Sequence, residues 1–99
     1  MKVALICTGG LSTNWIVKKI DQYAADHGLD VDLKAYGLTD YYPVIEEADA
    51  VLLGPQIGYY RKEIEEKLGH KIGVISSAAY ATANAAEILD QAKTLASQK

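Results

Sequence analysis

Apolar residues along the chain form short continuous runs separated by segments of helical periodicity. Two runs, Lys2–Ile6 and Ala50–Leu53, are apolar almost throughout, which predicts central strands covered on both faces. Residues 31–36 alternate apolar and polar side chains, which indicates a strand with one face in water, at an edge of the sheet. Residues 72–75 predict a fourth strand. The chain therefore supplies four strands.

The segments between and after these strands have the spacing and end signals of helices. Their expected limits are Ser12 or Thr13 to Gly28, Thr39 or Asp40 to Glu47, Ile57 or Gly58 to Leu68, and Asn84 to the frayed C-terminus. Gly28 and Gly69 are expected to stop two of them, and Asn84 with Glu87 resembles a capping box. Ser76 and Ser77 are interpreted as a turn.

Regular alternation of strand and helix predicts an α/β fold with a parallel sheet and helices on both faces. We expect the strand order 2-1-3-4, a truncated flavodoxin-like three-layer sandwich, with residues 1–99 forming one domain. In that order the chain changes direction between the first and third strands, and ligands bind in the crevice beyond their carboxyl ends. Cys7 and the segment Gly54-Pro55-Gln56 should flank this crevice.

Cys7, the only cysteine, is followed by a glycine-containing loop and a helix start. The backbone N–H groups of this stretch are suited to a phosphate or another anion, and Ser12 and Thr13 could add hydroxyls. Such a field favours the thiolate, so Cys7 is a candidate nucleophile. The candidate phosphate-binding residues are Thr8, Gly9, Gly10, Leu11, Ser12, Thr13 and Asn14.

Composition excludes several other classes of function. A net charge of -3 with lysines spread among glutamates gives no basic stripe for nucleic acid. One cysteine and two histidines, His27 and His70, give no zinc pattern, and we assign the histidines no catalytic role. No apolar run is long enough to span a bilayer, and no signal peptide is recognisable, so we expect a cytoplasmic protein.

A cysteine phosphatase loop, Cys-x5-Arg, would place an arginine at position 13, where this chain has Thr13. The only arginine is Arg61, and Asp40 or Asp49 are only guesses for a general acid. Hydrolysis is therefore disfavoured, and a carrier that holds a phosphocysteine fits better. A cysteine phosphatase or arsenate-reductase-like enzyme and a non-catalytic anion-binding module remain the alternatives.

Two motifs carry a family resemblance. The run Cys7 to Thr13 after the first strand and the run Val51-Leu52-Leu53-Gly54-Pro55-Gln56-Ile57-Gly58-Tyr59 after the third resemble the lactose/cellobiose enzyme IIB component of the bacterial sugar phosphotransferase system (PTS). The similarity extends over essentially the whole chain. Asn14 and Trp15 depart from the usual pattern, in which a serine and an aliphatic residue are common, but neither change removes a backbone donor.

The resemblance implies that Cys7 accepts a phosphoryl group from a phosphohistidine of the IIA partner. It implies transfer of that group to a β-linked disaccharide held by the membrane-embedded IIC partner, without a metal or organic cofactor. IIB would thus act in the cytoplasm, transiently at the inner face of the membrane. Gly54, Pro55, Gln56 and Tyr59 would form the wall of the crevice and a docking surface for partners.

Simpler interpretations exist for the same residues. A lone cysteine at a strand end is often a small buried apolar residue, and Gly54-Pro55-Gln56 can be only a strand terminator. Six tyrosines are typical of the edge of a core: Tyr36, Tyr41, Tyr42, Tyr59, Tyr60 and Tyr80. Four of these, at 41, 42, 59 and 60, follow strand ends and could instead line a rim that faces a partner.

Overall fold

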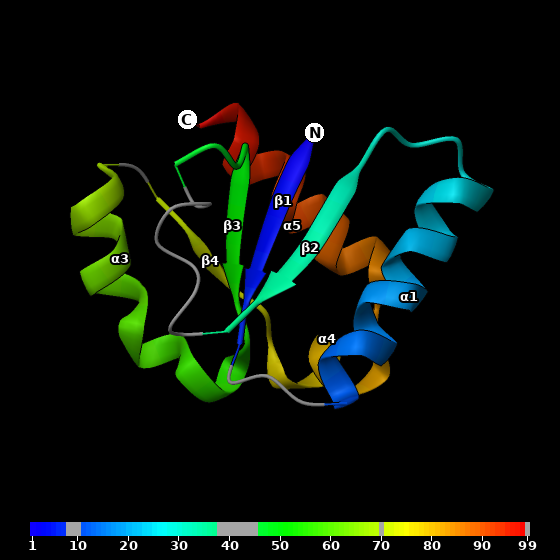
Figure 1. Cartoon of the computed structure of the whole chain (residues 1–99), viewed down its shortest axis with the longest axis horizontal. Helices are drawn as coiled ribbons and strands as arrows, with labels where there is room; N and C mark the ends of the chain where they lie inside the picture. Colours follow the sequence, from blue (N-terminus) through cyan, green and yellow to red (C-terminus); the bar gives the residue numbers. More distant parts are fainter. Residues whose placement is uncertain (8–10, 38–45, 70, 99) are drawn as a thin grey trace.

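The computed structural model describes residues 1–7, 11–37, 46–69 and 71–98, without the side chains of 11–13. Its elements, in chain order, are β1 (Lys2–Ile6), α1 (Leu11–Asp26), β2 (Asp32–Tyr36), β3 (Ala50–Leu53), the 3-10 helix η1 (Pro55–Tyr60), α3 (Arg61–Leu68), β4 (Gly73–Val74), α4 (Ser77–Thr82) and α5 (Ala85–Ser97). Figure 1 shows these elements along the chain.

The described strands form one parallel sheet in the order β2-β1-β3-β4, as the sequence predicts. β1 is central, with Ile6 level with Tyr36 on one side and with Leu53 on the other. All four strands run in the same direction, so their carboxyl ends meet at the lower edge of the sheet in Figure 1. The chain reverses its direction of travel across the sheet between β1 and β3, at the predicted switch point.

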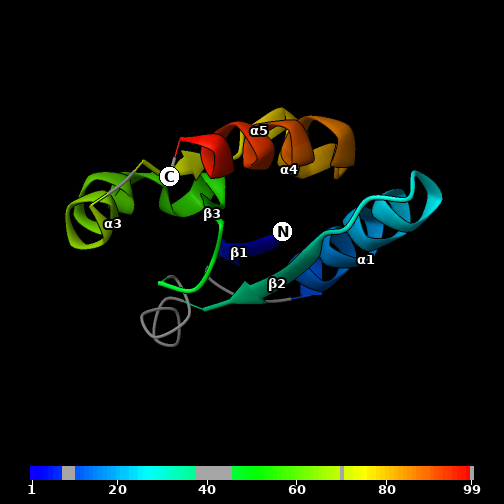
Figure 2. The ribbon, with the colours of Figure 1, turned by 90° about the horizontal axis from the view of Figure 1, so that it is seen from above.

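Helices cover both faces of the sheet. Alternate residues of the central strands, such as Leu5 and Leu52, pack with α1, α4 and α5 in one apolar cluster. The intervening residues, such as Ile6 and Leu53, pack on the other face with Ile57 of η1 and Ile64 of α3. Figure 2 shows α4 and α5 together on one side of β1 and β3. Because both faces are covered, the continuous apolar strands are buried throughout, and the predicted α/β architecture is confirmed.

The end of α1 follows the sequence expectation closely. Gly28 has a φ of +64°, its N–H donates to the Ala25 carbonyl, and the Leu29 N–H donates to the Ala24 carbonyl at 2.8 Å. This pair of bonds is a Schellman motif, which needs a residue in the left-handed region and so favours glycine. Gly69 ends α3 with a φ of +78°, also as predicted.

Several predicted boundaries were wrong. The third helical segment is divided, because Ile57 (φ −123°, ψ 22°) interrupts helical geometry and α3 begins only at Arg61. The fourth strand pairs over Gly73–Val74 alone. Ser76 and Ser77 do not form a simple turn: Ser76 Oγ accepts a bond from the Ala79 N–H and caps α4, a helix missing from the prediction. The helix predicted from Thr39 or Asp40 falls largely on residues 38–45, outside the described residues.

Candidate active site at the carboxyl edge of the sheet

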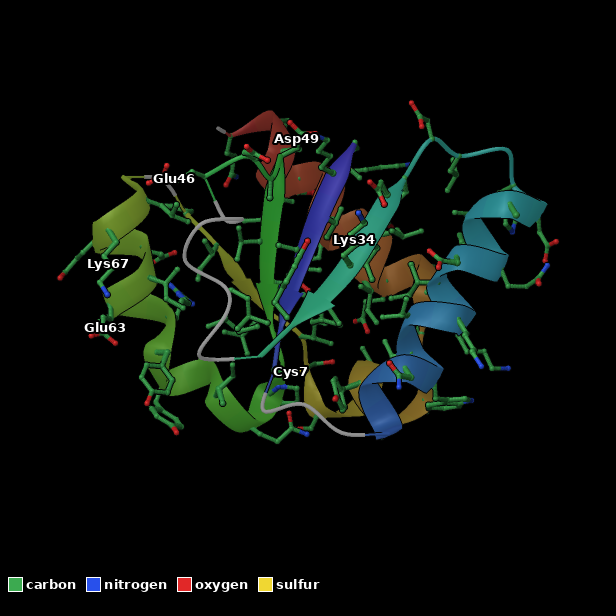
Figure 3. The ribbon with its side chains drawn as sticks, in the orientation of Figure 1. Cys7, Lys34, Glu46, Asp49, Glu63 and Lys67 are labelled. Carbon is green, nitrogen blue, oxygen red and sulfur yellow. The ribbon has the colours of Figure 1, made fainter. Side chains whose placement is uncertain are left out.

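Hydrogen bonds between strand exits fix the position of Cys7. The Cys7 N–H donates to the Tyr36 carbonyl at 3.0 Å, and the Gly54 N–H donates to the Ile6 carbonyl at 2.9 Å. The Ile75 N–H extends the row by donating to the Leu53 carbonyl at 2.9 Å. Cys7 therefore lies between the exits of β2 and β3, which is the crevice position expected from the strand order. Figure 3 shows Cys7 at this edge.

The side chain of Cys7 is buried, with 2% of its surface exposed. The sequence predicts that its sulfur faces the amides of Thr8, Gly9 and Gly10, but these three residues lie outside the described part of the chain. That the sulfur faces those amides stays a prediction. The burial itself means that a reaction at the sulfur requires the reagent to reach an enclosed position.

α1 begins at Leu11, one or two residues before the predicted start. Ser12 and Thr13 therefore lie in the first helical turn and do not precede it as caps. The first four N–H groups of a helix have no partner within it, so the backbone of 11–14 presents donors at this end of α1. Asn14, the last of the four, has an exposed side chain.

Gly54, Pro55, Gln56 and Ile57 form a tight turn directly after β3. The Ile57 N–H donates to the Gly54 carbonyl at 3.1 Å, and Pro55 occupies the first central position, where its fixed φ is favourable. Ile57 is 1% exposed and anchors the turn in the core, whereas Gln56 is exposed. The segment is thus a strand terminator that also holds Gln56 at a defined place beside Cys7.

Gly54 packs closely against the site. A Cβ at this position would lie 3.5 Å from Cys7 Cβ, 3.6 Å from Tyr80 Cε2 and 2.9 Å from Gln56 Oε1. The structure therefore places Cys7, Gly54 and Gln56 around one point and adds Tyr80 of α4. Sequence reasoning treated Tyr80 as a residue at the edge of the core, and the missing α4 was the reason that its place beside the site was not found.

A comparison with known protein families decides what this arrangement belongs to. Residues 2–91 match the family described as the PTS system, Lactose/Cellobiose specific IIB subunit. The chain belongs to this IIB family.

Individual IIB components resemble the chain over nearly its whole length. An oligo-beta-mannoside-specific EIIB component from Bacillus subtilis (strain 168) is 31% identical over 97 residues, covering 95% of this chain and 94% of the relative. A cellobiose-specific EIIB component from Lactococcus lactis subsp. lactis is 30% identical, covering 94% of each. The solution structure of a cellobiose-specific IIB component from Borrelia burgdorferi superposes with a TM-score of 0.81 at 29% identity, covering 100% of this chain and 94% of that one.

Family membership confirms the recognition made from the two motifs. IIB components are phosphotransferase-type components of sugar transport, and they work with IIA and IIC partners. The relatives differ in their named sugars, so the family assignment does not by itself choose a substrate. In the described parts of the chain, no helix has both the length and the apolar character of a membrane span.

Other charged residues of this IIB chain lie elsewhere. Asp49, one guess for a general acid, accepts a bond from the Lys2 N–H at 2.8 Å, at the amino end of β1 and opposite Cys7 (Figure 3). Asp40 lies outside the described residues. Arg61 begins α3 and contacts Glu65 at 3.6 Å, with 55% of its side chain exposed. Asp49 therefore does not supply the general acid of a cysteine phosphatase, and Arg61 does not supply its loop arginine.

Two exposed aromatic side chains of the IIB chain occur near the ends of β1 and β3. Trp15 in the first turns of α1 is 45% exposed, and Tyr59 in η1 is 75% exposed. The Tyr59 ring lies 4.6 Å from the ring of Tyr60. Tyr59 is therefore no part of the core, which favours the rim interpretation for this tyrosine; Tyr41 and Tyr42 lie outside the described residues.

A shallow groove lies on the sheet away from the helix start of α1. It has a volume of about 130 Å³ and lies over β1 and β2, lined by Lys2, Val3, Ala4, Asp32, Lys34, Tyr36, Glu47 and Ala48. This volume is below the range typical of small-molecule sites. Within residues 1–7, 11–37, 46–69 and 71–98, no three His, Cys, Asp or Glu side chains gather as metal ligands.

Proposed function

We propose that Cys7 accepts a phosphoryl group from a phosphohistidine of a IIA component and transfers it to a sugar held by a IIC component. The sugar is expected to be a β-linked disaccharide of the cellobiose, lactose or chitobiose type. The observation that carries the proposal is the position of Cys7 between the exits of β2 and β3, in a chain of the IIB family.

In the first step the Cys7 thiolate attacks phosphorus, an S–P bond forms, and the P–N bond of the donor breaks. The imidazole leaves with the electron pair of that bond. In the second step a sugar hydroxyl attacks phosphorus, a P–O bond forms, and the S–P bond breaks. The electron pair of the broken bond stays on the Cys7 sulfur, and the proton of the hydroxyl passes to solvent. No water takes part in either step, so the site must hold a phosphoryl group without promoting hydrolysis.

Main-chain donors support this chemistry. The N–H groups at the start of α1, Leu11 to Asn14, have no partner within the helix and are suited to the oxygens of a phosphoryl group. The backbone of Thr8, Gly9 and Gly10 is predicted to complete the ring of donors. Because these donors belong to the backbone, transfer needs no metal ion or organic cofactor.

Partner proteins must reach the enclosed sulfur. The donor and acceptor both approach the same atom, so IIA and IIC should dock in turn on one surface around Cys7. Gly54, Pro55, Gln56 and the exposed ring of Tyr59 lie on the β3 side of this surface. The contact with IIA is transient, and that with IIC takes place at the cytoplasmic face of the membrane.

The test is incubation of the chain with phosphoenolpyruvate, the general PTS proteins and a cognate IIA. Intact-protein mass spectrometry under non-acidic conditions should show one added phosphoryl group, located on Cys7. Cys7→Ser should lose the label, whereas His27→Gln should keep it, because His27 lies at the far end of α1.

Three results would contradict the proposal. The first is undiminished labelling of Cys7→Ser, or label found on another residue. The second is turnover of an aryl phosphate by the isolated chain, which would indicate a hydrolase. Tight anion or nucleotide binding that survives alkylation of Cys7, without labelling, would indicate a binding module instead.

A further inference from the structure

Gly54 has no conformational reason to be glycine. Its φ of −63° and ψ of 151° lie in the extended region, which any residue adopts readily. What distinguishes the position is space, since an added Cβ would lie only 2.9 Å from Gln56 Oε1. The missing side chain therefore makes room for the Gln56 amide over the end of β3.

The same space borders Cys7. The position of a Cβ on Gly54 is 3.5 Å from Cys7 Cβ and 2.9 Å from Gln56 Oε1, so both side chains meet above one glycine. A phosphoryl group on Cys7 would extend beyond the sulfur by an S–P and a P–O bond. Since Cys7 Cβ and Gln56 Oε1 both lie within 3.5 Å of the Cβ position on Gly54, a phosphoryl oxygen can meet the Gln56 amide when the sulfur is directed toward it.

The Gln56 amide is available for such a contact. Among the described residues, its side chain has no hydrogen-bond partner, and it is exposed. A glutamine amide carries two N–H donors and can rotate to present them. The turn that holds Gln56 is anchored by the buried Ile57, so the amide is offered from a fixed base.

We propose that Gln56 donates a hydrogen bond to the phosphoryl group on Cys7, and that Gly54 is the residue that permits this contact. The proposal rests on the function proposed above and adds a residue that touches the reacting group. A neutral donor stabilises the bound dianion without the fixed positive charge that an arginine would bring to a hydrolytic transition state. Gln56 would thus help the chain to hold a phosphocysteine and to release it only to an acceptor.

Gly54→Ala provides an unusually clean way to remove the contact. The added methyl is compatible with the backbone and makes ordinary contacts with Cys7 Cβ and Tyr80 Cε2. Only the end of the flexible Gln56 side chain is too close, so the amide must move away. Gln56→Leu removes the donor directly. Gly37→Ala is the matched control, because at the end of β2 its Cβ would meet none of the described residues within 4 Å.

The measurement is the equilibrium constant for phosphoryl exchange between phosphorylated IIA and each variant. This constant compares the separate proteins only, so damaged docking slows the approach to equilibrium but leaves its value unchanged. Loss of one hydrogen bond to a charged group should lower the constant about tenfold in Gly54→Ala and in Gln56→Leu. The double variant should fall no further than either single variant, and Gly37→Ala should match the wild type.

The outcomes separate this proposal from the one on which it rests. If the wild-type chain takes no phosphoryl group on Cys7, both proposals fall. If the wild type is labelled and Gln56→Leu keeps the wild-type constant, only the role of Gln56 is overturned. A further loss on adding Gly54→Ala to Gln56→Leu would show that the methyl acts on Cys7 directly, which also overturns it.

Discussion

Two glycines of neighbouring strands, Gly54 just after β3 and Gly73 at the start of β4, each have a glutamine amide close to where a Cβ would lie, yet their surroundings differ. At Gly73 in β4, an added Cβ would lie 2.6 Å from Gln91 Nε2, 2.9 Å from Leu95 Cδ1 and 3.1 Å from Leu52 Cδ2. Gln91 Nε2 donates to the Val74 carbonyl at 3.1 Å. At Gly54 only the Gln56 amide is too close, and that amide makes no bond to the described residues.

The difference shows how one local device serves two purposes. The Gln91 amide is held by its hydrogen bond to the Val74 carbonyl, so it belongs to the packing between the sheet and α5. The amide after β3 is exposed, and its N–H donors beside Cys7 make no bond to the described residues. A polar side chain fully occupied by the fold supports stability, whereas one left unoccupied at a strand exit is suited to a ligand.

The largest expected effect separates the two glycines by stability. Gly73→Ala should lower the free energy of unfolding by about 2 kcal/mol, because the methyl overpacks three neighbours. Gly54→Ala should be neutral or stabilising by at most about 1 kcal/mol, since its backbone suits alanine. Urea denaturation of both variants measures the contrast. An equal loss of unfolding free energy in the two variants would contradict the difference between the two glycines.

The glutamines offer a second test with isosteric changes. Gln91→Glu should cost about 1–2 kcal/mol, because a carboxylate cannot donate to the Val74 carbonyl and is repelled by it. Gln56→Glu should change stability by less than about 0.5 kcal/mol, as expected for an exposed side chain. The phosphoryl exchange constant should behave in the opposite way, falling in Gln56→Glu and staying at the wild-type value in Gln91→Glu. The same ranking of the two variants in both measurements would contradict this division of roles.

The sequence predicts the strands around these glycines well, but it predicts neither α4 nor the contact of Gln56 with Gly54. β1 and β3 followed from continuous apolar runs, which a sheet covered on both faces can bury, and the strand order followed from the alternation of strand and helix. α4 was missed because it has six residues rich in alanine, too short and too uniform for a helical pattern. The contact of Gln56 with Gly54 depends on the geometry of a turn, and no periodicity along the chain encodes it.

The predicted capping box shows the same limit at one residue. Asn84 Oδ1 accepts from the Glu87 N–H at 3.2 Å, as the spacing indicates. In a complete capping box the Glu87 side chain would accept from the Asn84 N–H. Here the Asn84 N–H donates instead to the carbonyl of Ala79 in α4. Local spacing predicted the bond made within α5, and the neighbouring helix determined the other.

A smaller effect is expected at Ser76, where β4 gives way to α4. Its Oγ accepts from the Ala79 N–H at 3.1 Å, so Ser76→Ala should cost about 1 kcal/mol through loss of the cap. Ser77→Ala, one residue later and also exposed, removes no cap and should be close to neutral. Thermal unfolding of the two variants checks the difference. A drop in the phosphoryl exchange constant of Ser76→Ala at unchanged stability would show instead that this hydroxyl belongs to the active site.

The smallest effect is expected at Arg61, on the β3 side of the comparison. Its pair with Glu65 is partly exposed and 3.6 Å long, so Arg61→Gln should cost no more than about 0.5 kcal/mol. Glu65→Ala should cost more, because Glu65 Oε2 also accepts from the Ile72 N–H at 2.9 Å and holds the start of the β4 segment. Both variants are compared by urea denaturation.

Arg61→Gln also tests the kind of chemistry performed beside Gln56. An arginine that stabilised a hydrolytic transition state would be indispensable, and its loss would prolong the lifetime of the phosphorylated protein. In a carrier that depends on backbone donors and a neutral amide, both the exchange constant and the lifetime of phosphorylated Cys7 should remain unchanged. A longer lifetime in Arg61→Gln would therefore place a cationic group in the reaction and remove the reason for a neutral donor at position 56.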